Sequence, residues 1–328
     1  MRTTETCWAN VRTAYPHAGT RNRFICLLAV ACLLTPALHG ESNACLSRTT
    51  LIGVSGANGE ASQGLTAADF KVTVGGKTAT VQSATPADRP PRVIILLDTS
   101  ANHDQQTWAA TQAMVDEFLA GFPEAGDFTL LMFDDKVERV VHETNRVSLQ
   151  GTVGEMFPSG KRESEAGLAE AIKKGSAGFD PYRQGDTEFL VTTSDQIQNE
   201  TAQALNLQRA VGIRLFGASF DQTIRSGPLP FDVYMTVETH SPLDAAARAS
   251  GGLWIWFDMS RQDTAALLRN AATAGRSTAE LVRNYRVLQL QLTSPITKPE
   301  KLKIELVKDA RKAEDRFSAY PRELFPCQ

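Results

Sequence analysis

The chain has 328 residues, of which 42% are hydrophobic and 22% charged. These fractions are near the globular average and exclude a collagen-like, coiled-coil or wholly disordered chain. A net charge of −3 gives no electrostatic basis for binding nucleic acid or an anionic membrane. The mean hydropathy of −0.22 excludes a polytopic membrane protein. The length predicts two domains, or one α/β domain with an appendage.

Residues 1–44 have the pattern of a secretory signal peptide. Basic residues precede the apolar run 24–34 (FICLLAVACLL), and small residues follow it. As a helix this run would rise about 16 Å, roughly half the hydrocarbon thickness of a bilayer. We therefore expect cleavage before Cys45 or after Gly40, export to the periplasm, cell envelope or medium, and no transmembrane segment in the mature chain. The alternative is a buried core helix.

Removal of this leader changes the cysteine inventory. Three of the five cysteines leave with it, and the mature chain keeps Cys45 and Cys327 at its two ends. An exported protein is free to form disulfides, and the ends of a domain often lie close together. The positions predict a Cys45–Cys327 bridge, with two thiols in flexible ends as the alternative.

Short alternating strands are predicted at both ends of the mature chain. Residues 70–74 (FKVTV) and 78–82 (TATVQ) flank Gly75-Gly76-Lys77, which predicts a hairpin turn. Residues 287–292 and 302–307 also alternate and are expected to pair with each other in antiparallel fashion. We assign residues 45–91 and 281–328 to an N-terminal and a C-terminal β segment.

Between these segments, residues 92–280 alternate between strand and helix patterns. Val93–Leu97 (VIILL) is continuously apolar, which is typical of a parallel strand buried on both faces. The pattern predicts a doubly wound, mostly parallel, Rossmann-like α/β sheet with ligands beyond the carboxyl ends of its strands. Residues 128–133 and 137–141 flank an acidic turn, Asp134-Asp135. A helix is expected from Asp263 to about Ala274.

Asp98, Ser100 and Asn102 directly follow the buried strand. A strand that ends in Asp-x-Ser-x-Ser before a long helix resembles a von Willebrand factor type A domain. The residues around the domain, including Pro90-Pro91, Ser250-Gly251-Gly252 and Asn284-Tyr285, resemble those of related proteins best known from Acidobacteria. The resemblance covers nearly all of the mature chain. It implies a von Willebrand type A domain at about 92–280, with one antiparallel strand at a side of the sheet.

In that family the three side chains begin a metal-ion-dependent adhesion site, so the resemblance implies a divalent cation such as Mg²⁺ as the cofactor. This sequence has Asn102 in the third place, where the family pattern has a serine, and it also departs from the pattern in the other ligands. Ala166 stands where a threonine is expected, with Ser164 two residues away. The later aspartate position falls on Ser194, with Asp195 one residue further on.

Two interpretations of this site follow. In the first, Asp98, Ser100 and Asn102 hold a cation with help from Ser164 or Asp195. In the second the site is degenerate, and Asp98 and Ser100 serve the turn at the strand end and the helix cap.

The sequence after the leader contains no catalytic cluster. Its three histidines form no His-Glu-x-x-His motif, and no Gly-x-Ser-x-Gly elbow is present. The resemblance therefore favours a non-catalytic module that binds a protein or cell-surface partner through residues 98–103, 160–166 and 194–199. A hydrolase using the same face is an alternative, indicated if a histidine or paired acids converge on Asp98. A structural component of the cell envelope is another.

Overall fold

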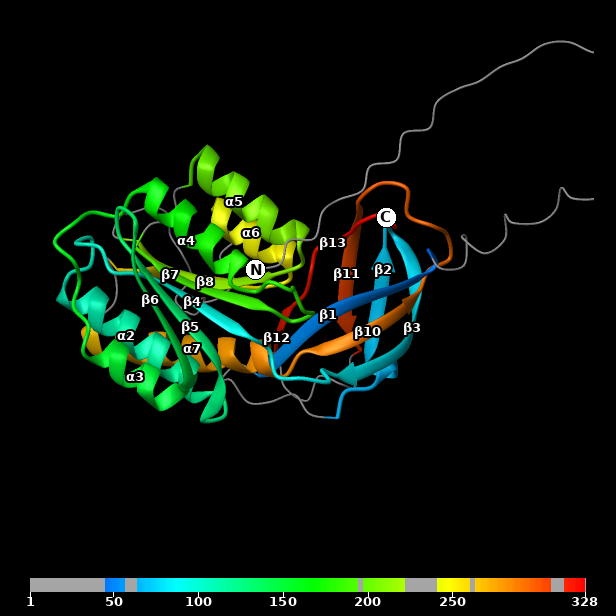
Figure 1. Ribbon diagram of the computed structural model, residues 1–328. Coiled ribbons are helices and arrows are strands. Elements are labelled where there is room, and N and C mark those ends of the chain that lie inside the picture. The colour runs from blue at the N-terminus through cyan, green and yellow to red at the C-terminus, as the bar shows by residue number, and fades with distance from the viewer. Residues whose placement is uncertain are drawn as a thin grey trace, which may run out of the picture. The chain divides into compact units, whose positions relative to one another are not determined.

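The computed structural model describes residues 45–56, 64–193, 197–221, 241–259, 263–307 and 316–327, and the strands within them form two sheets (Figure 1). The expected signal peptide and Asp195 lie outside the described residues. Within those residues, no helix is long and apolar enough to span a bilayer.

The first sheet has six strands in the order β6-β5-β4-β7-β8-β9. Its strands are β4 (Val93–Asp98), β5 (Ala125–Phe133), β6 (Val137–Asn145), β7 (Thr187–Thr192), β8 (Arg214–Asp221) and β9 (Trp254–Asp258). All neighbours are parallel except β5 and β6. Val93–Leu97 therefore lies inside the sheet, and the one antiparallel strand lies at its edge. The prediction of a doubly wound, mostly parallel α/β sheet is confirmed.

Helices cover both faces of this sheet (Figure 1). They are α2 (Gln105–Ala120), α3 (Arg146–Gly154), α4 (Glu165–Ala177), α5 (Asn199–Ala210), α6 (Pro242–Ser250) and α7 (Thr264–Arg283). One core cluster joins the sheet to α2, α3 and α7, and a second joins it to α4, α5 and α6. Side chains of β4 alternate between the clusters, with Ile95 and Leu97 in the first and Ile94 and Leu96 in the second. This double burial explains the unbroken apolar run.

Helix α7 is longer than predicted, because Gly275 is not a stop. A Cβ at this position would collide with the backbone carbonyl of Met114 in α2. The glycine therefore permits close packing of the two helices, and α7 continues to Arg283. The expected helix end near Ala274 was wrong because a sequence does not distinguish a glycine that ends a helix from one that admits a neighbour.

The second sheet is antiparallel and has the order β12-β1-β10-β3-β2-β11-β13. It consists of β1 (Ser47–Gly56), β2 (Phe70–Val74), β3 (Lys77–Pro86), β10 (Arg286–Gln291), β11 (Glu300–Leu306), β12 (Arg316–Ala319) and β13 (Glu323–Leu324), with a short 3-10 turn (Ala67–Asp69) before β2. The sheet thus combines both ends of the chain, as expected of the β appendage. Gly75 and Gly76 have φ values of 56° and 80°, which confirms the hairpin turn.

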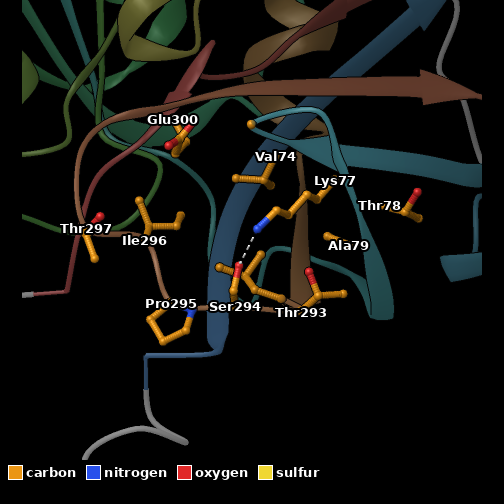
Figure 2. Close-up of a pocket in the computed structure, with 12 residues that line it drawn as sticks. Val74, Lys77, Thr78, Ala79, Thr293, Ser294, Pro295, Ile296, Thr297 and Glu300 are labelled. Atoms are coloured by element: carbon orange, nitrogen blue, oxygen red, sulfur yellow. Dashed lines mark hydrogen bonds between the residues drawn. The ribbon is translucent and has the colours of Figure 1, made fainter.

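The expected pairing of residues 287–292 with 302–307 was wrong. Strand β10 pairs with β1 and β3, while β11 pairs with β2 and β13. The β2–β3 hairpin therefore lies between them, and the connecting loop packs against it. Figure 2 shows Lys77 of β3 reaching Ser294 of this loop, and its Nζ lies 3.1 Å from the Ser294 Oγ. Alternation predicts which side of a strand is buried, but it does not identify the strand's partner.

The two cysteines come together at the ends of the described chain, although no disulfide joins them. The pKa of the Cys327 thiol is lowered by a hydrogen bond with the Cys45 side chain and, more weakly, by Arg48. The proximity agrees with the reason for expecting a bridge. The bridge itself stays a prediction.

Gly275→Ala tests the close packing of α2 and α7. Alanine favours a helix by about 1 kcal/mol over glycine, but here its methyl group would force the helices apart, so we expect a net destabilisation of about 1–3 kcal/mol in urea unfolding. Gly151→Ala in α3 is the matched control, because no atom lies within 4 Å of its Cβ position. It should stabilise the protein. Equal stabilisation by both substitutions would contradict the packing argument.

Glu188 of β7 gives the fold a predicted pH dependence. Its carboxyl group is fully buried, accepts hydrogen bonds from Ser176 (2.9 Å) and Gln208 (2.6 Å), and has a pKa raised by burial to about 8. The folded state holds this proton more tightly than the unfolded state, so the stabilisation is complete below the ordinary pKa and is lost as pH rises to about 8. Unfolding free energy should fall by at most about 1.4 kcal/mol per pH unit over this window. Glu188→Gln should flatten that slope; an unchanged slope would contradict it.

Candidate functional site

The candidate site begins where β4 ends, and a buried carboxylate organises it. Asp98 has no exposed area. Its Oδ1 accepts a hydrogen bond from the Ser100 backbone N–H at 2.8 Å, which closes a turn directly after the strand. The cap of α2 is a different residue, Asp104, which accepts from the Thr107 N–H at 2.7 Å. Asp98 thus serves the turn, as the second interpretation of the sequence required, but neither Asp98 nor Ser100 caps the helix.

The other oxygen of Asp98 binds the segment that follows β7. Oδ2 accepts from the backbone N–H of Thr193 at 3.0 Å and from its hydroxyl at 2.7 Å. One carboxylate therefore holds the carboxyl ends of two neighbouring parallel strands together.

Glu163 also belongs to this site, although no motif in the sequence marks it. Its carboxyl oxygens lie 2.9 Å from the Thr192 hydroxyl and 3.3 Å from that of Thr193. Burial and the charge of Asp98 raise the pKa of Glu163 to about 8, and the two carboxyl groups share a hydrogen bond. Glu163 is therefore protonated at neutral pH. It follows Lys161-Arg162 in a polar stretch that resembles an exposed loop, so only the folded structure identifies it.

The side chain of His103 also lies next to Asp98. Its Nε2 lies 3.6 Å from Asp98 Oδ2, and its ring contacts Trp108 edge-on at 5.2 Å between centroids. Burial lowers the pKa of His103 despite the nearby carboxylate, so the ring is neutral at pH 7. Burial thus favours the uncharged forms of both Glu163 and His103, the two titratable groups that lie against Asp98.

The loop that follows α3 crosses the end of β4 and is held there by hydrogen bonds. The backbone N–H of Ser159 donates to the Thr99 carbonyl, and that of Ala101 donates to the Lys161 carbonyl. Asp134, itself buried, accepts the Ser159 hydroxyl at 2.8 Å. In the acidic turn Asp134-Asp135, Asp134 therefore faces inward and holds this loop.

The remaining acids of the turn are neutralised by a lysine. Carboxylate oxygens of Asp134, Asp135 and Glu138 lie within 4.8 Å of one another. Lys161 Nζ donates to Asp135 at 3.1 Å and to Glu138 at 2.8 Å. These contacts account for the acidic cluster as an ion-pair network.

The other predicted ligands have different surroundings. Ser164 caps α4, because its Oγ accepts from the Gly167 N–H at 3.0 Å and donates to the Asp135 carbonyl at 2.9 Å. Asn102 is exposed, and its backbone N–H lies 3.4 Å from the Ser100 Oγ. The structure thus brings Asp98 and Ser100 together, and Asp195 lies outside the described residues.

The loop presents an aromatic side chain to solvent. Phe157 is 82% exposed. Lys161 and Arg162, on the same loop, and Ala101 and Asn102, on the turn after β4, are also exposed. From the sequence alone, Phe157 would be assigned to the core, because phenylalanine is usually buried. Its exposure is visible only in the folded structure.

Comparison with known proteins finds solved structures that are similar to this chain. They include a von Willebrand factor type A protein from Catenulispora acidiphila, at 9% identity and a TM-score of 0.44, covering 88% of this chain and 74% of that one. The manganese-loaded TRAP protein of Plasmodium vivax has 10% identity and a TM-score of 0.40, covering 72% and 95%. An aerotolerance-related membrane protein of Bacteroides fragilis has 14% identity and a TM-score of 0.44, covering 58% and 98%.

No protein-family model matches the sequence, and no curated protein matches it. The fold assignment therefore depends on the strand order of the central sheet and its antiparallel edge strand, which agree with the sequence resemblance.

Asp98→Ala tests the structural importance of the carboxylate. The substitution leaves the N–H groups of Ser100 and Thr193 and the Thr193 hydroxyl without their acceptor, so we expect a loss of about 3 kcal/mol of unfolding free energy. Asn102→Ala, at the exposed position of the same turn, should change it by less than about 0.5 kcal/mol. Similar values for the two variants in urea unfolding would show that Asp98 does not hold the strand ends.

Proposed function

We propose that this protein is an exported, non-catalytic binding module that recognises a protein or cell-surface partner at the carboxyl ends of its parallel strands. The observation that carries the proposal is the exposure of Phe157 on a loop fixed by Asp134 and by backbone hydrogen bonds to the turn after β4. Aromatic anchors beside basic side chains are typical of interface hot spots, and a preordered loop loses little entropy on binding. Lys161 and Arg162 supply the basic neighbours.

The hydrolase alternative has one observation in its favour. His103 and Glu163 do converge on Asp98, as that alternative requires. However, the side chains of Asp98 and His103 have no exposed area, and both oxygens of Asp98 already accept hydrogen bonds. A general base has to reach the proton that it abstracts. The burial of this cluster therefore favours a structural role for it and a binding role for the surface above.

We further propose that the adhesion site is degenerate and binds its partner without a metal. A divalent cation of the magnesium type needs several oxygen ligands with free lone pairs. Asp98 uses its oxygens for Ser100, Thr193 and the shared hydrogen bond with Glu163. Ser164 caps a helix, and Asn102 is exposed whereas Asp98 and Ser100 are buried. The described residues do not fit a cation in this arrangement.

The test is capture of partners from a native envelope fraction by immobilised protein, quantified per protein band. Phe157→Ser should weaken capture by about tenfold or more, as expected for a hot-spot aromatic residue. Val147→Ser is the matched control, because Val147 is 51% exposed but begins α3, near the opposite ends of the parallel strands. It should retain full capture.

Chelation of divalent cations with EDTA should leave the capture unchanged. Equal capture by Phe157→Ser and the unaltered protein would reject the proposed face. Loss of capture in EDTA, restored by Mg²⁺, would reject the metal-free site while leaving the face intact.

A further inference from the structure

A cavity of about 390 Å³ lies at the amino ends of the parallel strands of the central sheet, where β1, the start of β8 and the C-terminal residues meet. Its lining includes four arginines and one acid, namely Arg48, Arg183, Arg209, Arg214 and Glu323. Three partly exposed apolar side chains, Tyr182, Val211 and Phe325, also line it. Its size is within the usual range for small-molecule sites, and its charge is strongly positive.

Arg214, the first residue of β8, is the unusual member of this set. It is only 1% exposed, and its guanidinium group packs against the rings of Tyr285 (4.6 Å) and Phe216 (5.3 Å). Its Nη2 donates to the Thr187 hydroxyl at 3.1 Å and to the Val282 carbonyl at 3.2 Å. Within the described ranges, its Nε and Nη1 have no acceptor. Two donors of a buried cation are thus unsatisfied.

No carboxylate in the described structure pairs directly with Arg214. Asp186 acts on it electrostatically, but Arg92 binds both oxygens of Asp186, at 2.9 and 2.6 Å. Two guanidinium groups therefore share one buried carboxylate. Burial lowers the pKa of Arg214 to about 10, which leaves it charged at neutral pH. A buried cation without a paired anion is costly, and a bound anion would remove that cost.

A second unsatisfied group lines the same cavity. The hydroxyl of Thr50 in β1 is buried and has no hydrogen-bond partner among the described residues. Nearer the surface, Arg209 pairs with Glu323 at 2.7 Å and stacks over the Phe325 ring at 4.7 Å. The cavity thus combines unsatisfied polar groups within and cationic and aromatic side chains outside.

We propose that this cavity binds a small oxyanion that carries an apolar group. Its carboxylate or phosphate oxygens accept hydrogen bonds from Arg214 and Thr50, and its apolar part packs against Tyr182 and Phe325. Arg supplies planar, paired donors that suit both kinds of oxyanion. The unsatisfied atoms are enclosed, so the ligand displaces a neighbouring side chain as it enters. This site is independent of the face around Phe157, because it lies at the amino ends of the strands.

The experiment measures the melting temperature of the protein with benzoate, phenyl phosphate or the uncharged benzyl alcohol, at matched ionic strength. At about ten times its dissociation constant, a bound anion should raise the melting temperature by roughly 2 °C. Benzyl alcohol should not. The anion that gives the larger shift identifies the source of the oxyanion as a carboxylate or a phosphate ester.

Arg214→Met keeps the side-chain length and removes the charge, and it should abolish the shift while leaving the unliganded protein at least as stable as before. Arg276→Met is the matched control, because Arg276 is half exposed and pairs with Glu117 on the α2–α7 surface. It should keep the shift. Arg183→Ala, at the exposed rim, should weaken binding at least about threefold through the loss of one charge and serves if Arg214→Met does not fold.

The proposal is overturned if neither anion raises the melting temperature. It is also overturned if Arg214→Met keeps the shift, or if Arg183→Ala and Arg276→Met lower the affinity equally. A purely structural role for Arg214 predicts the reverse pattern for Arg214→Met, with a large loss of stability and no anion-dependent shift in the unaltered protein.

Discussion

The surface at the carboxyl ends of the sheet depends on one buried carboxylate. Asp98 closes the turn after β4 through Ser100 and holds the segment after β7 through Thr193. Water is excluded from it, so each of these hydrogen bonds is strong and none is easily replaced. The neighbouring Glu163 is protonated, which satisfies Asp98 further without adding a second charge. The loops above the strand ends are positioned on the strand ends that these hydrogen bonds hold together.

Buried titratable groups have different surroundings at the carboxyl ends and at the amino ends of the strands of the central sheet. At the carboxyl ends of the strands, donors from the chain itself surround the Asp98 side chain, and the pKa of the adjacent Glu163 is raised. At the amino ends of the strands, Arg92 and Arg214 are two cations beside Asp186. The Nε and Nη1 atoms of Arg214 have no acceptor among the described residues. In the first arrangement the oxygens of Asp98 find donors within the chain, while the two ring nitrogens of His103 have no hydrogen-bond partner among the described residues. In the second a guanidinium group without a carboxylate partner of its own faces a cavity lined by further arginines, which is the physical basis for proposing an anionic ligand there.

Much of the fold could be predicted because β4 is buried on both faces and its sequence shows this directly. The glycine pair at 75–76 likewise predicted a hairpin, since both residues need positive φ. The partner of β10 could not be predicted, because an alternating pattern fits any strand with one buried side. The true end of α7 was hidden by Gly275, whose reason is the nearby backbone of α2.

The site was predicted only as far as local sequence reaches. Asp98 and Ser100 are adjacent in the chain and form one turn, so the motif located them. Glu163 and Thr193 meet Asp98 through the tertiary fold, and no local pattern marks either one. The exposure of Phe157 is equally a tertiary property, since it depends on where Asp134 and Thr99 fix the loop.

We propose that hydrogen bonds within the chain close the strand-end site, in place of a cation. It is tested most directly by titrating the purified protein with Mn²⁺ and measuring the free ion by electron paramagnetic resonance. We expect no site with a dissociation constant below the millimolar range, in the unaltered protein and in Asn102→Ala alike. One tight site per chain that disappears in Asn102→Ala or Ser100→Ala would contradict it.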